Sequence, residues 1–157
     1  MKKDYQKIAR EKTFKHIQQV RFLLQCFSNQ LRIRGDVHDH SKMKPFEMHY
    51  LAKIEQEIDE NGQAPFGSYE YKRRSTEILG PMLKHHYENN SHHPEHYENG
   101  VSGMCLLDVM EMLADWKAAS ERGEETSINL EKALERFGIE GQLASVLRNT
   151  CEKQGWK

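Results

Sequence analysis

The sequence predicts an all-α fold, on three observations. The chain is rich in Lys, Glu, Leu, Met, Gln and Arg and poor in Val and Thr, which favours helix over strand. Apolar residues recur at steps of three and four along most segments. Glycine and proline lie between these segments, where helices end or begin. Because 157 residues suit one core, we expect a single-domain helical bundle of about six to seven helices over residues 1–157.

The first predicted helix covers residues 4–31, with Gly35 as its stop. His16 lies four residues before Val20, on or beside the apolar stripe, and is therefore predicted to point inward. A lone inward histidine is more often a hydrogen-bonded core residue than a ligand. The stripe consists of Tyr5, Ile8, Val20, Leu24, Phe27 and Leu31.

A short second helix is predicted to carry a possible metal-ligand pair, His38-Asp39, and Lys42 on nearly one face. Asp36 is its expected N-cap, and Pro45 suits the first position of a third helix. That third helix is expected to run to about residue 59 and to end at Asn61-Gly62, with its inward residues at Tyr50, Leu51, Ile54 and Ile58.

A fourth helical segment is predicted over residues 69–88, capped by Ser68 and interrupted at Gly80-Pro81. His86 continues its inward stripe after Leu79 and Met82 or Leu83. Residues 89–103 are too rich in Asn, Gly and Pro for regular helix, and this polar loop holds three histidines, including His92 and His93.

The next helix is predicted from about 104 to 120, and its expected buried face is Leu106, Val109 or Met110, Leu113 and Trp116. Asp108, Glu111 and Asp115 form an adjoining acidic strip, which is usually solvent-exposed, although Asp115 adjoins the buried face.

The core is expected within 4–122, under covering helices within 127–151. Ser127 is the expected cap of the first covering helix, and Phe137-Gly138 is the expected break before the second. The inward residues are expected to be Leu130, Ala133, Leu134, Leu143, Val146 and Leu147.

Charge and cysteine usage narrow the classes of function. The net charge of −1 provides no basic field for nucleic acid, and Lys72-Arg73-Arg74 is too small a cluster to change that expectation. Three cysteines without CxxC spacing indicate reduced thiols in the cytoplasm. No signal peptide and no apolar run of about 18 residues is present, so no membrane partner is expected.

Histidine is over-represented, with nine residues where average usage predicts about three or four. Adjacent imidazole and carboxylate groups at His38-Asp39 are two good ligands for a divalent metal. We expect His40, His49 and His96 to be surface residues or to lie behind the ligands. The full set of candidate metal ligands, in order, is His16, His38, Asp39, His86, His92 or His93, and Asp115.

The order H…HD…H…H…D resembles the ligand pattern of the HD-domain superfamily of metal-dependent phosphohydrolases. A second resemblance covers most of the chain. The stretches HDHSKM with Glu47 behind it, HHYENNSHHPEH, LLDVMEMLADWKAAS and RFGIEGQLASVLRNT resemble a small phage and bacterial family of unknown function. The second resemblance implies the cytosol of a bacterium or a phage-infected host.

The superfamily resemblance implies a ligand set. His16, His38, Asp39 and Asp115 would hold one metal, and Asp39 would bridge to a second ion held by His86 and by His92 or His93. A one-metal site fits equally well. Mixed imidazole and carboxylate ligands suit Mn, Fe, Co, Ni or Zn, and superfamily relatives also use Mg.

The same resemblance implies a metal-activated water that attacks a nucleotide or another small phosphoester. Lys42 would bind a phosphate oxygen, and Asn90 another substrate oxygen. Glu95 or Glu111 would move a proton or orient a ligand histidine. Phosphomonoesterase, phosphodiesterase and nucleotidase activities all fit. The alternative hypothesis is a non-catalytic metal-binding interaction module, and an oligomer is compatible with either.

Overall fold

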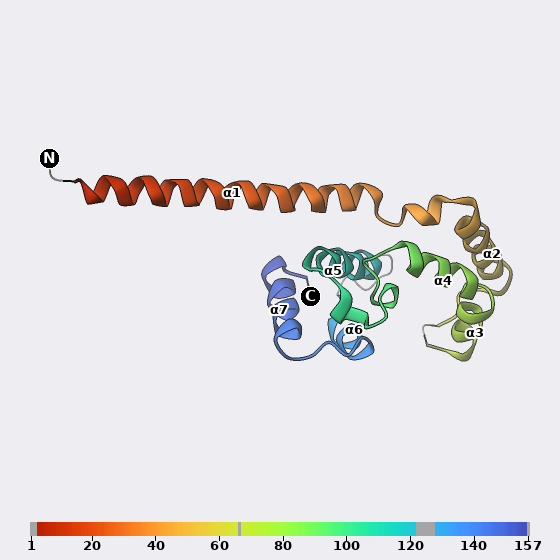
Figure 1. The fold of residues 1–157 in the computed structure, drawn as a ribbon. Helices are drawn as coiled ribbons and strands as arrows, with labels where there is room; N and C mark the ends of the chain where they lie inside the picture. Colours follow the sequence, from red (N-terminus) through yellow and green to blue (C-terminus); the bar gives the residue numbers. More distant parts are fainter. Residues whose placement is uncertain (1–2, 66, 122–127, 157) are drawn as a thin grey trace. The chain divides into compact units, whose positions relative to one another are not determined.

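The computed structural model describes residues 3–65, 67–121 and 128–156. Seven α-helices and three 3₁₀ turns account for the regular structure of these residues, which contain no strand (Figure 1). The predicted all-α fold with six to seven helices is therefore confirmed. Packing divides the chain into two units, 1–37 and 38–157, so the single domain stays a prediction.

The first unit is essentially one helix, α1, which runs from Tyr5 to Val37. The prediction of a long N-terminal helix is confirmed, but its stop at Gly35 and the N-cap role of Asp36 are wrong. Both residues lie inside the last turn. A glycine costs a helix only about 1 kcal/mol relative to alanine, so the helix continues through it.

The expected burial of the α1 stripe is not found. No residue of α1, which is described throughout, is buried, and His16 is exposed. A single helix can bury an apolar stripe only against another element, and this unit offers none. Among the described residues, no helix is both long enough and apolar enough to cross a bilayer.

The second unit begins with a tight turn instead of the predicted second α-helix. His38 and Asp39 precede a 3₁₀ turn, η1, from His40 to Met43. Helix α2 then runs from Pro45 to Asn61, which confirms the predicted start at proline and the end before Gly62. Its predicted inward residues, Tyr50, Leu51, Ile54 and Ile58, are half-buried.

The predicted helix over 69–88 is divided into α3, from Tyr69 to Glu77, and α4, from Gly80 to Asn89. The Ser68 hydroxyl accepts the backbone N–H of Tyr71 at 3.1 Å, so the predicted cap is confirmed. Pro81 lies in the first turn of α4, where its missing N–H costs nothing. The expected kink is thus a complete break, and α4 delivers His86 to the interior, 1% exposed.

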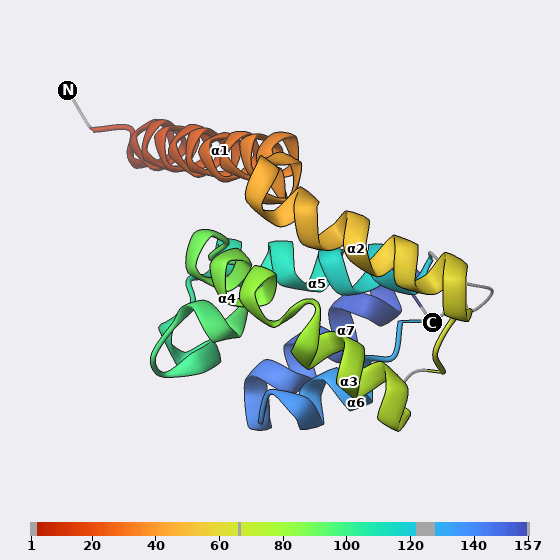
Figure 2. The same cartoon turned by 90° about the vertical axis from the view of Figure 1, so that its right-hand side faces the viewer.

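The apolar core of the second unit lies between three helices. These are α5 (Leu106–Ser120), α6 (Leu130–Arg136) and α7 (Gly141–Gln154), and they lie side by side in both views (Figures 1 and 2). Trp116 of α5 stacks on Phe137, with ring planes 4° apart. The core residues are Val109, Met112, Leu113, Ile128, Leu130, Leu134, Ile139, Ala144, Leu147 and Cys151. The C-terminal helices therefore supply much of the core rather than only cover it.

Some of the predicted core residues are wrong. Leu106 and Val146 are exposed, whereas Met112 and Ala144 are buried. The true buried face of each helix is rotated by part of a turn from the predicted one, which apolar spacing alone does not resolve. The Ser127 cap lies outside the described residues.

Asp108 joins the histidine loop to the start of α5. Its buried carboxylate accepts hydrogen bonds from the Ser91 hydroxyl at 2.8 Å, the Tyr97 hydroxyl at 2.9 Å and the backbone N–H of Cys105 at 2.8 Å. Burial alone would raise the pKa of Asp108, but hydrogen bonds from Cys105, Ser91 and Tyr97 outweigh it and hold the pKa well below its ordinary value. This residue of the acidic strip is therefore a buried anchor and not a solvated charge.

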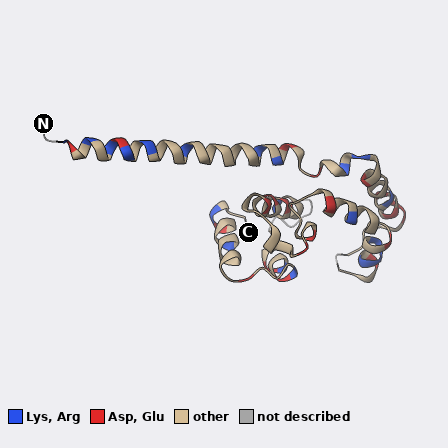
Figure 3. Cartoon of the chain, viewed as in Figure 1, with Lys and Arg blue, Asp and Glu red and all other residues tan. Residues whose placement is uncertain are grey.

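The basic cluster at Lys72-Arg73-Arg74 is largely offset by neighbouring acids. Arg73 forms ion pairs with Glu57, Glu70 and Glu77, and Arg74 pairs with Glu70 and Glu57. Figure 3 shows basic and acidic residues interspersed on α3. Arg73 and Arg74 are thus engaged by acids of the same surface, and the expectation that nucleic acid is not a partner stays a prediction.

Replacement of Asp108 by Asn should destabilise the second unit by about 2–3 kcal/mol at pH 7, because the amide cannot accept all three donors. A carboxylate with a depressed folded-state pKa contributes stability above its unfolded pKa of about 4, and this contribution is lost as the pH falls toward the folded value. The difference in the free energy of unfolding between wild type and Asp108→Asn, measured with urea, should therefore be smaller at pH 2 than at pH 7. Glu98→Ala, at an exposed position, is the control. A constant gap would contradict this role.

Candidate metal centre

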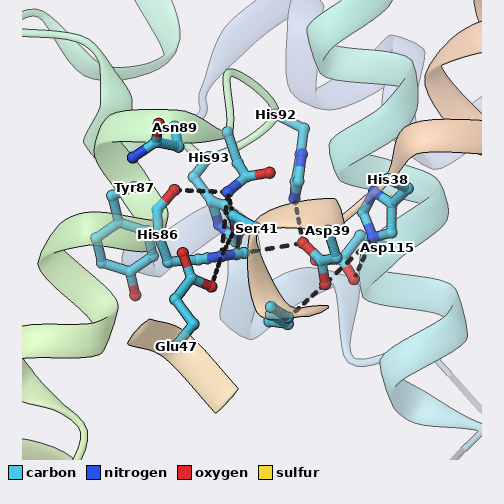
Figure 4. Close-up of polar contacts among 12 residues, drawn as sticks. His38, Asp39, Ser41, Glu47, His86, Tyr87, Asn89, His92, His93 and Asp115 are labelled. Carbon is cyan, nitrogen blue, oxygen red and sulfur yellow. Dashed lines mark hydrogen bonds and ion pairs between the residues drawn. The ribbon is translucent and has the colours of Figure 1, made fainter. Parts of the chain in front are cut away.

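The centre is built around Asp39, whose backbone has an unusual conformation. With φ 55° and ψ 20°, it is the one non-glycine residue with positive φ in the described part of the chain. Aspartate tolerates this left-handed conformation better than most residues. The turn ends α1 and begins η1, and Figure 4 shows the Asp39 carboxylate among the histidines.

Four histidines from three places surround this carboxylate. His38 precedes it in the turn, His86 comes from the last turn of α4, and His92 and His93 come from the segment that follows α4. His86 and His92 are 1% and 2% exposed. Residues 86 to 93 therefore bring three imidazoles to one part-buried carboxylate, because the loop after α4 turns back.

The histidine Nε2 atoms face the carboxylate. Nε2 of His86 lies 3.2 Å from Asp39 Oδ1, and Nε2 of His92 lies 3.5 Å from the same oxygen. Nε2 of His93 lies 3.0 Å from Nε2 of His86. On the other side, Nε2 of His38 lies 3.6 Å from Asp39 Oδ2 and 3.5 Å from Oδ1 of Asp115 on α5.

Two of these atoms are left unsatisfied. Asp39 Oδ1 and His92 Nε2 are buried and have no hydrogen-bond partner among the described residues. A buried polar atom without a partner is costly, and two facing acceptors would both be satisfied by a cation between them. The donor set of carboxylate oxygen and imidazole nitrogen suits a divalent transition metal.

Glu111 of α5 holds the other ring nitrogen of two histidines. Its Oε1 lies 2.9 Å from Nδ1 of His38 and 3.2 Å from Nδ1 of His92. A ring that donates Nδ1–H to a carboxylate keeps Nε2 available as a ligand. The predicted orienting role of Glu111 therefore has direct contacts to support it.

Glu47 performs the same task for α4. It is 0% exposed, and its two oxygens lie 2.7 Å from Nδ1 of His85 and 3.0 Å from Nδ1 of His86. Burial raises the pKa of Glu47, but hydrogen bonds from His85, Ser41 and His86 outweigh it and lower the pKa. The ionised carboxylate only accepts, so Nδ1 of His86 carries the proton and Nε2 faces Asp39.

The pKa values of two histidines, His93 and His38, are shifted in opposite directions. Burial, with the adjacent His92 and His86, lowers the pKa of His93 to about 3, so this ring is neutral near pH 7. A hydrogen bond to Asp115 raises the pKa of His38 to about 9, against the effect of burial and together with Glu111 and Asp39. A ligand imidazole must be deprotonated, so His93 is ready to bind a metal whereas His38 would first release a proton.

Two groups of ligand atoms are close enough to hold an ion. Asp39, His86, His92 and His93 form the first group, and the second group consists of His38, His92 and Asp115; within each group the ligand atoms lie within 4.8 Å of one another. The structure thus brings together every predicted ligand of the second unit, and both His92 and His93 take part. His16 lies on α1 in the first unit, and its ligand role stays a prediction.

The other predicted site residues are found in structural contacts. Lys42 Nζ pairs with Asp39 Oδ2, and Asn90 Nδ2 donates to the Ser41 hydroxyl at 2.8 Å. Glu95 pairs with Arg136 at 3.0 Å. The proposed phosphate, substrate and proton-transfer roles of Lys42, Asn90 and Glu95 stay predictions. His40, His49 and His96 are exposed, as expected.

Sequence reasoning missed the roles of Glu47 and Ser41. Glu47 lies in the first turn of α2, where an acidic residue is favoured by the helix dipole and so attracts no special interpretation. The Ser41 hydroxyl lies 3.0 Å from Nδ1 of His86, 45 residues away in the sequence. Only the packing of η1 and α2 on α4 reveals these contacts.

Comparison with known proteins establishes the family of the chain. The model of a family of unknown function (DUF5662) matches residues 6–153, and the chain belongs to that family. No curated protein and no solved structure matches it.

Replacement of Glu47 by Ala should release His86 from its single tautomer and reduce stability by about 2 kcal/mol, because the buried Nδ1–H of His86 and the part-buried Nδ1–H of His85 lose their acceptor. Long-range ¹H–¹⁵N spectra of the histidine rings report the tautomer, and urea unfolding reports the stability. The matched control is Glu55→Ala, at an exposed position of the same helix. An unchanged His86 ring spectrum in Glu47→Ala would show that Glu47 does not orient this ring.

Proposed function

We propose that the protein is a metal-dependent phosphohydrolase whose centre is formed by Asp39, His86, His92 and His93, with His38 and Asp115 beside it. The observation that carries the proposal is the pair of unsatisfied buried atoms, Asp39 Oδ1 and His92 Nε2, within a converging set of ligand atoms. The order of these ligands in the sequence, which resembles the HD-domain superfamily, supports the same class of activity.

The residues of the chain have distinct tasks in this proposal. Asp39, His86, His92 and His93 hold a divalent ion, for which Mn, Fe, Co, Ni and Zn are the best candidates and Mg a further one. A bound ion would lower the pKa of water and offset charge on phosphoryl oxygens. Glu47 and Glu111 keep the ligand nitrogens aimed at the centre.

The substrate in this proposal is a nucleotide or another small phosphoester. Lys42 is the nearest candidate for binding a phosphoryl oxygen, since its ammonium lies at the cluster and its side chain is 29% exposed. Lysine binds phosphate as a compact point charge. Asp115 and Glu111, partly exposed at 19% and 13%, are carboxylates that can take up a proton at the edge of the centre.

One observation favours a second candidate function, a non-catalytic metal-binding interaction module. The first ligand group offers four protein donors, which is enough to saturate a tetrahedral ion. Structural metal sites are closed in this way, whereas catalytic sites keep a position for water. Tight metal binding without hydrolysis of any phosphoester would select this function.

Replacement of Asp39 by Ala tests the catalytic proposal. With Mn²⁺, Co²⁺, Ni²⁺, Zn²⁺ or Mg²⁺ added, wild type should hydrolyse at least one member of a panel of nucleotides and aryl phosphate mono- and diesters. Asp39→Ala should lose about two to four orders of magnitude in turnover, as expected when charge stabilisation and proton transfer are lost together.

His49→Ala, at an exposed histidine outside the cluster, is the control and should retain the wild-type rate. Far-UV circular dichroism establishes that each variant is folded. Equal turnover of wild type and Asp39→Ala would exclude the centre as the active site.

A further inference from the structure

The two oxygens of Asp39 face different surroundings. Oδ1 faces Nε2 of His86 at 3.2 Å and Nε2 of His92 at 3.5 Å. Oδ2 faces the Lys42 ammonium and, at 3.6 Å, Nε2 of His38. The two groups of ligand atoms around Asp39 are therefore not equivalent, because a fixed positive charge already lies on one side.

We propose that Lys42 is an internal cation that limits this centre to one divalent ion, held by Asp39 Oδ1, His86, His92 and His93. The inference rests on the proposed function, because it presumes that the cluster binds metal. It assigns to Lys42 a task that differs from phosphate binding: the ammonium takes the place of a second ion beside His38 and Asp115.

The backbone holds Lys42 in position for this task. The amide of Lys42 donates to the carbonyl of Asp39 at 2.8 Å, which closes the turn and brings the two residues onto one side of it. The lysine side chain then needs only to fold back along the turn to reach Oδ2. The ion pair is part-buried, with side-chain exposures of 29% for Lys42 and 15% for Asp39.

Charge explains why the ammonium and a second ion exclude each other. The second group of ligand atoms comes from His38, His92 and Asp115, and Nε2 of its His38 lies 3.6 Å from Oδ2 of Asp39, the oxygen that pairs with Lys42. Because Nε2 of His92 serves the first ion, a second ion beside His38 and Asp115 would depend on Oδ2 of Asp39 as a further donor. A divalent ion bound to Oδ2 would lie beside the ammonium on the same oxygen, and like charges this close repel strongly in a partly buried site. A second ion would therefore have to displace Lys42.

An ion in the first position is not repelled in this way by Lys42. Its ligand atoms are Oδ1 of Asp39 and the imidazole nitrogens of His86, His92 and His93, whereas Lys42 lies on the opposite oxygen. With Lys42 on Oδ2, Asp39 serves the first ion through one oxygen and does not bridge two ions. The centre is thus mononuclear as long as this ion pair is kept.

The stoichiometry of metal binding tests this inference without any activity assay. Metal-free protein is titrated with Zn²⁺ in a calorimeter, and bound zinc is counted by elemental analysis after removal of free ion. Wild type should bind one equivalent at the centre. Lys42→Met, which keeps the length of the side chain without its charge, should bind a second equivalent at least about tenfold more tightly than wild type does.

Three variants support the test. Lys44→Met removes the same charge from an exposed lysine two residues away and should keep one equivalent. Lys42→Arg retains the positive charge and should also keep one. Lys42→Gln repeats the neutral substitution with a polar side chain, in case Lys42→Met is poorly folded by circular dichroism.

Each outcome decides between the claims. Two equivalents in wild type, or one equivalent in both neutral Lys42 variants, would overturn the role of Lys42 while leaving the metal centre intact. No zinc bound by wild type or by any variant would overturn the proposed function itself, and the inference with it. One equivalent in wild type and two in the neutral variants alone is the result expected.

Discussion

The part-buried carboxylate of Asp39 is the constraint on which the site depends. His86, His92 and Lys42 approach it, and although burial raises the pKa of Asp39, the ion pair with the Lys42 ammonium helps to hold that pKa below its ordinary value. An ionised carboxylate in the interior is stable only with such partners. Its Oδ1 and Nε2 of His92 still have no hydrogen-bond partner among the described residues, and a divalent ion between them would satisfy both atoms.

A set of further carboxylates supports this arrangement. Glu47 and Glu111 each contact the Nδ1 atoms of two histidines. Asp108, in the first turn of α5, accepts a hydrogen bond from the loop that contains His92 and His93. All three acids are buried or nearly so, and their hydrogen bonds lie between segments far apart in the sequence. The geometry of the centre therefore comes from polar contacts that lie beside the apolar core of α5, α6 and α7 rather than within it.

Much of the fold could be predicted from local signals, because the physics of helix ends is local. The Ser68 cap, the start of α2 at Pro45 and the break before Pro81 follow from the chemistry of single residues. The end of α1 could not be predicted in this way, since a glycine lowers helix stability without setting the end. The left-handed conformation of Asp39 could not be predicted from its neighbours, because the sequence around His38-Asp39 is equally compatible with a helix.

The candidate ligands were predictable because the chemistry of metals restricts them to histidine and acids. The acids that hydrogen-bond to these histidines were not predictable, because the sequence does not distinguish a buried glutamate such as Glu47 from a solvated one in the first turn of a helix. The acidic strip of α5 shows the same limit, because Asp108, Glu111 and Asp115 have the spacing of a solvent-exposed face. Each of them nevertheless contacts a residue of the centre or of the loop that carries His92 and His93. Long-range packing decides such cases.

X-ray absorption at the zinc edge of the zinc-loaded protein tests the central claim most directly, because it reports the ligands of the bound ion. The account predicts a first shell of nitrogen and oxygen, with the outer-shell scattering of about three imidazole rings, as expected for His86, His92 and His93 with Asp39. A first shell of oxygen alone, with no imidazole scattering, would place the ion elsewhere and contradict the account.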